Sequence, residues 1–275
     1  MTINCNGNLI DLSVPKVMGI LNLTPNSFYD GNKYTSDVEI LSQAEKLLRE
    51  GAFCIDLGAY STKPNAEYVS IDEEKTRLFP VLEKILKEFN PIISVDTFRS
   101  EIANDAINMG VAIINDISGG TLDDNMFNVV AKHNVPYILM HIKGEPKTMQ
   151  NLTEYNNLLT DISYYFSEKI AQLREQGIND IIIDVGFGFA KTLAQNYELL
   201  HHLNYFKWLN LPLMVGVSRK SMIYKLLNTS PQDALNGTSA MHTLALNNGA
   251  NILRAHDVKE AIECIKIMEE YNKYE

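Results

Sequence analysis

Eight short runs rich in Val, Ile and Leu each end at a polar residue, and together these residues supply carboxylates, amides and cations. Carboxylate oxygens accept hydrogen bonds from amino and ring N–H groups, whereas an amide both donates and accepts, so such a set can bind the mixed edges of a flat heterocycle. One acidic residue at such a position can equally be the cap of the next helix, so the prediction depends on several sharing one place. The eight residues are Asn22, Asp56, Asp96, Asn115, His141, Asp184, Ser218 and Arg254.

Several carboxylates that end neighbouring strands also suggest a binding site for a divalent cation. Their spacing is not that of a dedicated metal cage, which favours a metal carried in by substrate phosphates over one held by the protein alone. Cations after the seventh and eighth runs indicate an anion site, with Arg219 and Lys220 ahead of Ser221, and Arg254 ahead of His256. The loops after the last two strands of a barrel frequently bind phosphate, which supports this prediction.

Three loops contain small, aromatic or hydroxyl-bearing residues that could cover a flat ring and exclude water. They span residues 22–31, 58–64 and 184–189, and turn formation alone would also explain many of their residues. The side chains concerned are Phe28, Asp30, Thr62, Lys63, Pro64, Gly188 and Phe189.

The elements that must position these residues alternate between apolar runs and helical segments, which predicts an α/β fold of the TIM (β/α)8 barrel type. A doubly wound open sheet shows the same alternation, but no GxGxxG turn follows the first run. After the first strand, which ends at Asn22, we predict strands over 53–56, 91–96, 111–115, 135–140, 181–184, 211–217 and 251–254. Capping signals at Ser36 and Ser70 begin two helices, and the other predicted helices span 101–109, 124–133, 153–176, 234–247 and 258–271.

The length of 275 residues is typical of one barrel, so we predict a single domain over 1–275. A formal net charge of −10 argues against a general nucleic-acid binder, which needs clustered Lys and Arg. No apolar stretch has the length of a membrane span and no signal peptide is recognisable. Cys5, Cys54 and Cys264 are scattered without metal-ligand spacing, which fits reduced thiols in the cytoplasm.

The motifs follow one another in an order that resembles the dihydropteroate synthase family of pterin-binding enzymes. MGILNLTPNSFYDG is similar to the first family signature and IDLGAYSTKP to the second, and SVDTF, IINDISGG, LMH, DVGFGFAKT, VSRKS and RAHDVKE come next. The resemblance extends from Val17 to Val258. It implies a barrel that condenses 6-hydroxymethyl-7,8-dihydropterin pyrophosphate with p-aminobenzoate to give 7,8-dihydropteroate and pyrophosphate, a step of folate biosynthesis that sulfonamides inhibit.

The resemblance also implies roles for residues, a Mg²⁺ cofactor and a homodimer. The residues expected to bind the pterin are Asp56, Asp96, Asn115, Met140, Asp184 and Lys220. Those expected at the pyrophosphate are Asn22, Lys63, Arg254 and His256, with Asn22 also expected at the metal. Those expected at p-aminobenzoate and on the covering loops are Phe28, Asp30, Thr62, Lys63, Pro64, Gly188, Phe189 and Ser221. The catalytic set is expected to be Asn22, Asp96, Asp184, Lys220, Arg254 and His256.

Some residues depart from the family pattern. Lys63 stands where the family has Arg, and a point charge replaces a planar two-pronged donor, so we predict altered sulfonamide affinity. Ala59 and Asn65 replace glycines, Asn26 replaces an aspartate and Val185 replaces a proline. The alternatives are a noncatalytic or divergent pterin-binding paralogue, a pterin-dependent methyltransferase domain that serves a corrinoid partner, and an aldolase that uses Lys220 as a Schiff base.

Overall fold

The structure is a computed structural model that describes residues 1–23, 37–60, 68–146 and 148–274. Eight parallel strands form a closed barrel, because β10 pairs with β3 as well as with β9. This closure confirms the predicted barrel and excludes the open sheet. The strands are β3 (Lys16–Asn22), β4 (Cys54–Gly58), β5 (Ile93–Asp96), β6 (Ile113–Asp116), β7 (Tyr137–Met140), β8 (Ile181–Asp184), β9 (Leu213–Val215) and β10 (Ile252–Ala255).

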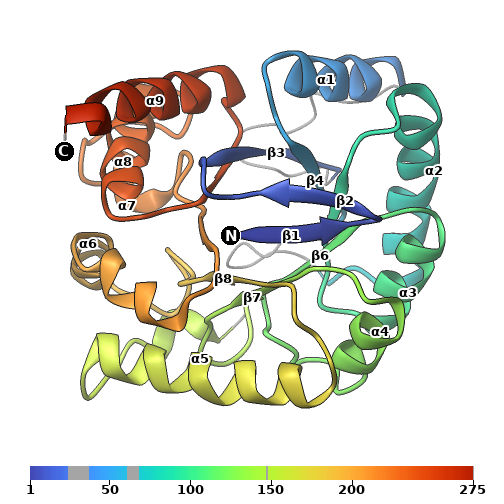
Figure 1. Cartoon of the computed structure of the whole chain (residues 1–275), viewed down its shortest axis with the longest axis horizontal. Helices are drawn as coiled ribbons and strands as arrows, with labels where there is room; N and C mark the ends of the chain where they lie inside the picture. Colours follow the sequence, from blue (N-terminus) through green and yellow to red (C-terminus); the bar gives the residue numbers. More distant parts are fainter. Residues whose placement is uncertain (24–36, 61–67, 147, 275) are drawn as a thin grey trace.

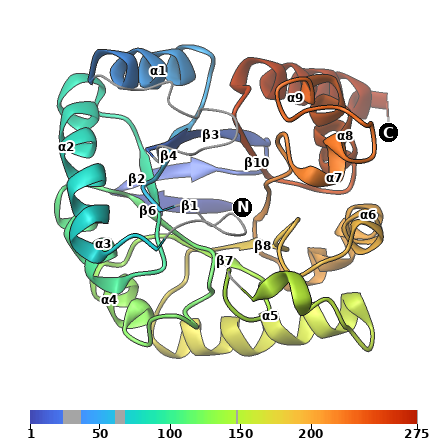
Figure 2. The ribbon, with the colours of Figure 1, turned by 180° about the vertical axis from the view of Figure 1, so that it is seen from behind.

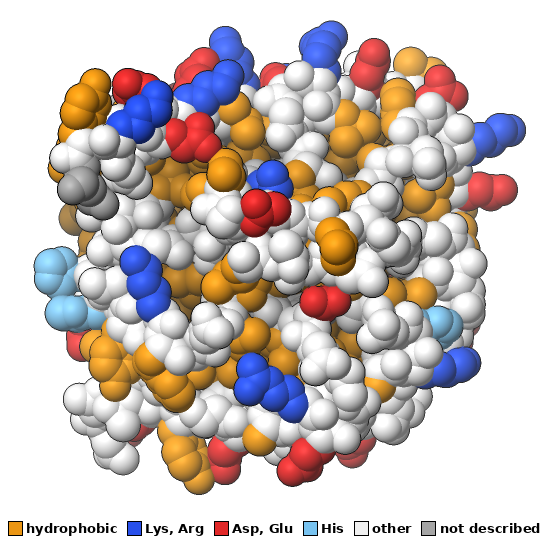
Figure 3. Space-filling view, in the orientation of Figure 1, with side chains coloured by type: hydrophobic (Ala, Val, Ile, Leu, Met, Phe, Trp, Pro, Cys, Tyr) orange, Lys and Arg blue, Asp and Glu red, His pale blue; other side chains and the backbone are white. Residues whose placement is uncertain are grey.

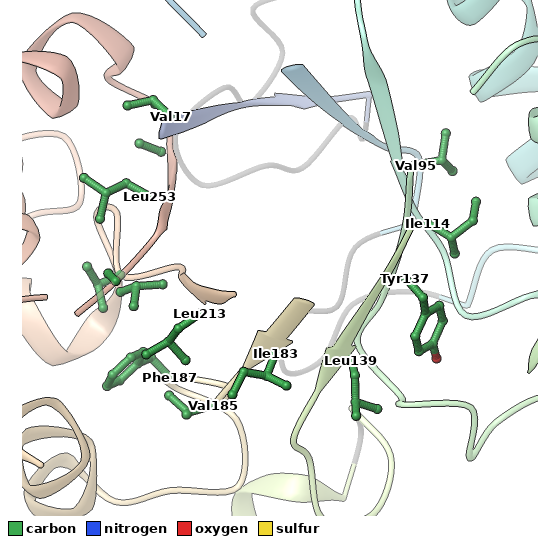
Figure 4. Close-up of a cluster of buried hydrophobic side chains, with 14 of the residues drawn as sticks. Val17, Val95, Ile114, Tyr137, Leu139, Ile183, Val185, Phe187, Leu213 and Leu253 are labelled. Atoms are coloured by element: carbon green, nitrogen blue, oxygen red, sulfur yellow. The ribbon is translucent and has the colours of Figure 1, made fainter. Parts of the chain in front are cut away.

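Alternate side chains of each strand point out of the barrel or into it. The outward set is apolar and buried against the helices, as Val95, Ile114 and Leu139 illustrate (Figure 4). The inward set changes character along the barrel axis. Near the amino ends of the strands it is a buried apolar cluster that includes Met18, Cys54, Ile138, Ile182, Met214 and Ile252. Toward the carboxyl ends it becomes polar, so the barrel has an apolar floor and a polar mouth.

Strand register aligns the polar inward residues. Asp56 pairs with Ser94 of the next strand, Gly58 pairs with Asp96, and Asp96 in turn pairs with Asn115. Because residues paired in a parallel sheet share a face, these side chains lie beside one another at the mouth. The sheet therefore brings Asp56 and Asn115 together, although they are 59 positions apart in the chain.

An antiparallel hairpin, β1 (Thr2–Cys5) and β2 (Asn8–Asp11), lies across the amino end of the barrel (Figure 1). Ile3, Cys5 and Leu12 are fully or almost fully buried in the floor cluster. Two long-range hydrogen bonds fix this region: the Asn4 N–H donates to Asp180 Oδ2 at 3.2 Å, and Asn251 Nδ2 donates to the Leu12 carbonyl at 3.0 Å. The hairpin was not among the predicted elements.

Helices surround the barrel on its outside (Figures 1 and 2). The predicted cap at Ser70 is confirmed, since its side chain accepts from the Glu73 N–H at 3.1 Å. The helices are α1 (Asp37–Arg49), α2 (Ile71–Phe89), α3 (Ser100–Asn108), α4 (Met126–His133), α5 (Leu158–Glu175), α6 (Leu193–His201), α7 (Ser221–Tyr224), α8 (Leu235–Asn247) and α9 (Val258–Tyr271). Short 3-10 turns occupy η1 (Met149–Asn151), η2 (Leu203–Leu209) and η3 (Asn272–Tyr274).

Two helical predictions need correction. The helix expected from residue 153 begins at Leu158, because the Asn157 side chain accepts from the Thr160 N–H and caps it there. Helix α6 was not predicted, although Thr192 and Gln195 form a capping box at its start. Among the described residues, no helix has both the length and the apolar composition that a bilayer crossing needs. The face that bears the hairpin displays acidic and basic side chains both around its edge and nearer its middle, with hydrophobic side chains between them (Figure 3).

Candidate active site

Arg254 is at the centre of the polar mouth and is bound by two carboxylates from neighbouring strands. Its Nε donates to Asp56 Oδ2 at 2.6 Å, and its Nη2 donates to Asp96 Oδ2 at 2.9 Å. Asn115 Nδ2 donates to the same Asp56 oxygen at 3.0 Å. The four residues come from β4, β5, β6 and β10, so the predicted convergence of strand ends is real. Asp56 lies deepest, since it is fully buried.

Asp96 has an unusual electrostatic environment. The pKa of its carboxyl group is raised to about 7, chiefly by burial. The charges of Asp56 and Asp116 contribute to this rise, and the Arg254 guanidinium opposes it. A carboxyl group with a pKa near neutrality can change its protonation state in response to a bound ligand. This environment supports a functional assignment more strongly than a structural ion pair would.

Two buried oxygens at the mouth lack a hydrogen-bond partner within the described part of the chain. They are Asp56 Oδ1 and Ser94 Oγ, on residues that pair across β4 and β5. Unsatisfied buried polar atoms are costly, and an ordered water or a polar ligand can satisfy them. Sequence reasoning missed Ser94, although a lone hydroxyl residue inside an apolar strand was the available signal.

Asp184 and Lys220 form the second polar pair of the mouth. A side chain at Gly216 would lie 3.7 Å from Lys220 Nζ and 3.9 Å from Asp184 Oδ2, so the absence of one there gives both groups room. Asp184 Oδ1 accepts from the Gly186 N–H at 2.8 Å. Burial lowers the pKa of Lys220 to about 8, while the charge of Asp184 opposes this shift. Burial likewise raises the pKa of Asp184, and Lys220 opposes that change.

The loop after β8 holds Lys220 from the other side. Lys220 Nζ donates to the Phe187 carbonyl at 2.7 Å and lies 4.9 Å from the centroid of the Phe189 ring. Gly188 lies between Phe187 and Phe189 with φ of 83°, a left-handed conformation that glycine adopts without strain. Ser221 follows Lys220 as the first residue of α7.

An apolar wall lies beside these polar groups. Met140, at the end of β7, is buried in a small cluster with Ile117, Ile142 and Met149, and Phe98 and Phe189 pack against it. An apolar wall beside polar edge-binding groups is what a flat heterocycle requires, because its faces are apolar and its edges are polar. The expected positions of Met140 and Phe189 are consistent with that use.

The predicted anion site is only partly assembled as expected. His256 Nδ1 lies 3.1 Å from Ser218 Oγ, which also accepts from the His256 N–H. Arg219, however, forms a buried ion pair with Asp257 through Nε at 2.7 Å and Nη2 at 2.9 Å. Its Nη1 also donates to the Pro231 carbonyl at 2.9 Å. Arg219 therefore fastens its loop to the start of α9, a pairing that the sequence analysis did not anticipate.

The amide oxygen of Asn22, which could be a metal ligand, lies near Asp96. A side chain at Gly58 would lie 3.5 Å from Asn22 Oδ1 and 3.8 Å from Asp96 Oδ2, so these oxygens flank a small hollow. Within the described ranges, no three His, Cys, Asp or Glu side chains form a metal cage. One amide oxygen with a neighbouring carboxylate fits a Mg²⁺ ion that takes its remaining ligands from phosphate and water.

Other predicted residues fall outside the described ranges or were missed. Phe28, Asp30, Thr62, Lys63 and Pro64 lie outside the described residues, as does the capping residue Ser36. Lys191 was not proposed, yet its buried ammonium contacts His141 and two loop carbonyls. The available signal was a lysine directly after an apolar, glycine-rich segment.

Comparisons with known proteins agree with this geometry. The model of the family described as "Pterin binding enzyme" matches residues 18–256. The dihydropteroate synthase of Escherichia coli strain K12 is 42% identical over 271 residues, which cover 98% of this chain and 96% of that protein. The Bacillus subtilis dihydropteroate synthase is 42% identical over 255 residues, covering 92% of this chain and 87% of the relative.

Two solved structures superpose on this chain over nearly their whole length. The Yersinia pestis dihydropteroate synthase in a sulfonamide drug complex superposes with a TM-score of 0.95 at 41% identity, covering 99% of this chain and 100% of that one. The Xanthomonas albilineans dihydropteroate synthase with 4-aminobenzoic acid gives a TM-score of 0.90 at 33% identity, with 98% of both chains covered.

Proposed function

The chain belongs to the pterin-binding enzyme family as a dihydropteroate synthase, and from this membership we propose which residues carry each part of its reaction. The enzyme is a transferase of folate biosynthesis that joins 6-hydroxymethyl-7,8-dihydropterin pyrophosphate to p-aminobenzoate. The observation that carries the proposal is the cluster of Asp56, Asp96, Asn115 and Arg254 at the barrel mouth, next to Asp184 and Lys220.

The pterin ring binds among these groups. Asp96, Asp184 and Asn115 receive the amino and ring N–H groups of the pterin, because carboxylate and amide oxygens are hydrogen-bond acceptors. Lys220 donates to an acceptor on the ring, and Met140 packs against its face. The raised pKa of Asp96 supports this assignment, since a cationic or N–H-rich ligand repays the cost of ionising a buried carboxyl group.

The reaction breaks the bond between the pterin methylene carbon and the pyrophosphate oxygen. Early cleavage leaves positive charge on the pterin, which the carboxylates of Asp96 and Asp184 stabilise. The amine of p-aminobenzoate is neutral at pH 7 and attacks the methylene carbon without a strong general base. After the new C–N bond has formed, the amine nitrogen loses a proton to water or to the departing pyrophosphate.

Arg254 and His256 bind the pyrophosphate and stabilise the charge that it gains on departure. Binding substrate requires Arg254 to share its guanidinium between the phosphate and the carboxylates that now hold it. Asn22 would hold Mg²⁺ through its amide oxygen, and the donor chemistry beside Gly58 fits that ion. When bound, the ion supplies charge neutralisation at the phosphate oxygens.

The second substrate binds on the rim, where Phe189 stacks on its ring and Ser221 binds its polar end. Thr62, Lys63 and Pro64, which lie outside the described residues, are proposed to bind the same substrate. Phe28 and Asp30, also outside the described residues, are proposed to keep water from capturing the pterin cation. Gly188 allows the left-handed turn between Phe187 and Phe189. The sulfonamide bound by the Yersinia pestis enzyme supports the proposal that sulfonamides compete for this position.

The protein is further proposed to act in the cytoplasm as a homodimer. Its three cysteines are buried and unpaired, which suits a reducing compartment. Light scattering coupled to size exclusion measures the assembly directly: a mass of twice 31.0 kDa supports the dimer, and the monomer mass contradicts it.

The deciding experiment is dihydropteroate formation from the two substrates with and without Mg²⁺, together with calorimetry of pterin binding. Mg²⁺-dependent product supports both the reaction and the metal. Product formation that survives complete removal of divalent ions contradicts the Mg²⁺ proposal alone. Pterin binding without product favours a noncatalytic paralogue or a methyltransferase domain, and absence of both signals contradicts the proposed function.

A further inference from the structure

Lys191 is a buried lysine that the proposed reaction does not use. Its side chain follows the loop after β8, and only 5% of the residue is exposed. Its Nζ donates to the Gly186 carbonyl at 3.0 Å and to the Phe189 carbonyl at 2.9 Å. A third contact joins Nζ to His141 Nδ1 at 3.1 Å. Burial lowers the pKa of Lys191 to about 7, and the three polar contacts of Nζ give the buried amino group the partners that burial requires.

The loop that Lys191 holds contains one residue in a costly backbone conformation. Gly186, Gly188 and Ala190 have positive φ, at 70°, 83° and 49°; glycine adopts such values freely, whereas Ala190 does so at a cost. A side chain at Gly186 would come within 2.1 Å of the His141 carbonyl, so the loop backbone presses against the end of β7. Conformations of this kind persist where surrounding contacts over-determine them, and the three bonds of Lys191 are such contacts.

The same loop determines the position of Lys220. The Phe187 carbonyl accepts from Lys220 Nζ at 2.7 Å, and the Phe189 ring lies 4.9 Å from that nitrogen. Lys191 bonds to the carbonyls on either side of this segment, at Gly186 and Phe189. Lys191 thus binds the loop at two of its carbonyls, and the loop in turn contacts Lys220 at the barrel mouth.

We propose that Lys191 is a positioning residue of the synthase, which holds the loop over 185–190 so that Phe187 and Phe189 fix Lys220 for substrate. The proposal rests on the proposed function, because it takes Lys220 and Phe189 as the groups that face the pterin and p-aminobenzoate. Lys191 itself touches no substrate. Its effect on the reaction must therefore pass through the geometry of the loop and reach both substrate positions together.

The test is the Lys191→Met variant, which keeps the side-chain length and removes all three hydrogen bonds. We expect the Kd for pterin pyrophosphate, measured by calorimetry, and the KM for p-aminobenzoate each to rise about tenfold or more, since small misplacements of binding groups have large kinetic effects. The matched control is Asn251→Ala, which removes two 3.0 Å hydrogen bonds, to the Leu12 carbonyl and from the Leu213 N–H, at the amino end of the barrel. The control should lower Tm and leave both constants unchanged.

The two roles of a buried lysine give different results. A purely structural role lowers the folded fraction, and with it the apparent kcat, while the constants of the folded enzyme stay the same. Constants within twofold of wild type in folded Lys191→Met protein would therefore overturn the proposal. If that variant does not fold, Lys191→Gln carries the same test, because its amide retains two donors. A wild-type protein that binds no pterin pyrophosphate would contradict the proposed function instead, whatever the variants do.

Discussion

Replacing Asp96 by asparagine should stabilise the unliganded protein at alkaline pH while it weakens pterin binding. The carboxyl group is buried at the barrel mouth, where its Oδ2 accepts from Arg254 Nη2 at 2.9 Å. Its pKa is raised from 3.8 to about 7, chiefly by burial. Asparagine has nearly the same shape and retains an oxygen that can accept from Arg254. The substitution therefore removes mainly the cost of ionising this group.

The sign and size of the effect follow from proton linkage. Between pH 4 and pH 7 the native state binds more protons than the unfolded state, so the free energy of unfolding of the wild type falls as pH rises through that interval. At about 1.4 kcal/mol per pKa unit, a rise of roughly three units sets an upper limit of about 4 kcal/mol above pH 7. The side chain is still 15% exposed, so solvent screens part of this cost, and we expect about 2 kcal/mol.

The assay is urea unfolding of wild type, Asp96→Asn and Asp124→Asn at pH 5 and pH 8. Asp124 is exposed, so its variant controls for the loss of one negative charge. The advantage of Asp96→Asn over wild type should grow by about 1 kcal/mol between the two pH values, since part of the total is already present at pH 5, and the control should show no such growth. Pterin affinity should fall about tenfold to a hundredfold, the value of a charged hydrogen bond. An Asp96→Asn protein that gains nothing at pH 8 would refute the reasoning.

Three other perturbations have expected outcomes. The kcat/KM for the pterin substrate should decline above a pH of about 8, because the Lys220 ammonium then loses its proton. Lys220→Met should be at least about a hundredfold less active, and its pH–rate profile should lack this alkaline decline. In a urea titration, Gly186→Ala should lower the free energy of unfolding by about 3–5 kcal/mol, because its Cβ would meet the His141 carbonyl at 2.1 Å. Gly7 also has positive φ, at 85°, but has open space around it, so Gly7→Ala should lower that free energy by only about 1–2 kcal/mol. Lys63→Arg restores a two-pronged donor and should strengthen sulfonamide inhibition about threefold to tenfold in a steady-state assay, and unchanged inhibition with unchanged kinetics would count against a role for Lys63 in drug affinity.

The sequence predicted those parts of the fold that depend on local pattern. An apolar run followed by a polar residue marks a strand that leaves the core at the barrel mouth, and Asp96 and Asp184 do end β5 and β8. Neither residue needed a distant partner to be found. The same reasoning identified the order of the elements, because β/α alternation is written into consecutive segments of chain.

Features that depend on distant partners could not be found in this way. The ion pair of Arg219 was not anticipated because its carboxylate partner, Asp257, lies 38 positions away, and the sequence of a phosphate-type loop does not show whether its cation is paired. Lys191 was overlooked because its burial depends on His141, 50 positions earlier. The β1–β2 hairpin was missed because its buried side chains pack on a floor assembled from strands throughout the chain.

The pairing of β10 with β3 also has a consequence for synthesis of the protein. The first barrel strand ends at Asn22 and the last begins at Ile252, so one edge of β3 has no strand beside it until almost the whole chain has left the ribosome. At about 5–20 residues per second, the intervening segment takes roughly 10–50 s to translate. During that interval an apolar strand edge is open to wrong pairing. Nascent chains stalled before β10 should therefore depend on chaperones for solubility, and extending them through that strand should relieve this dependence.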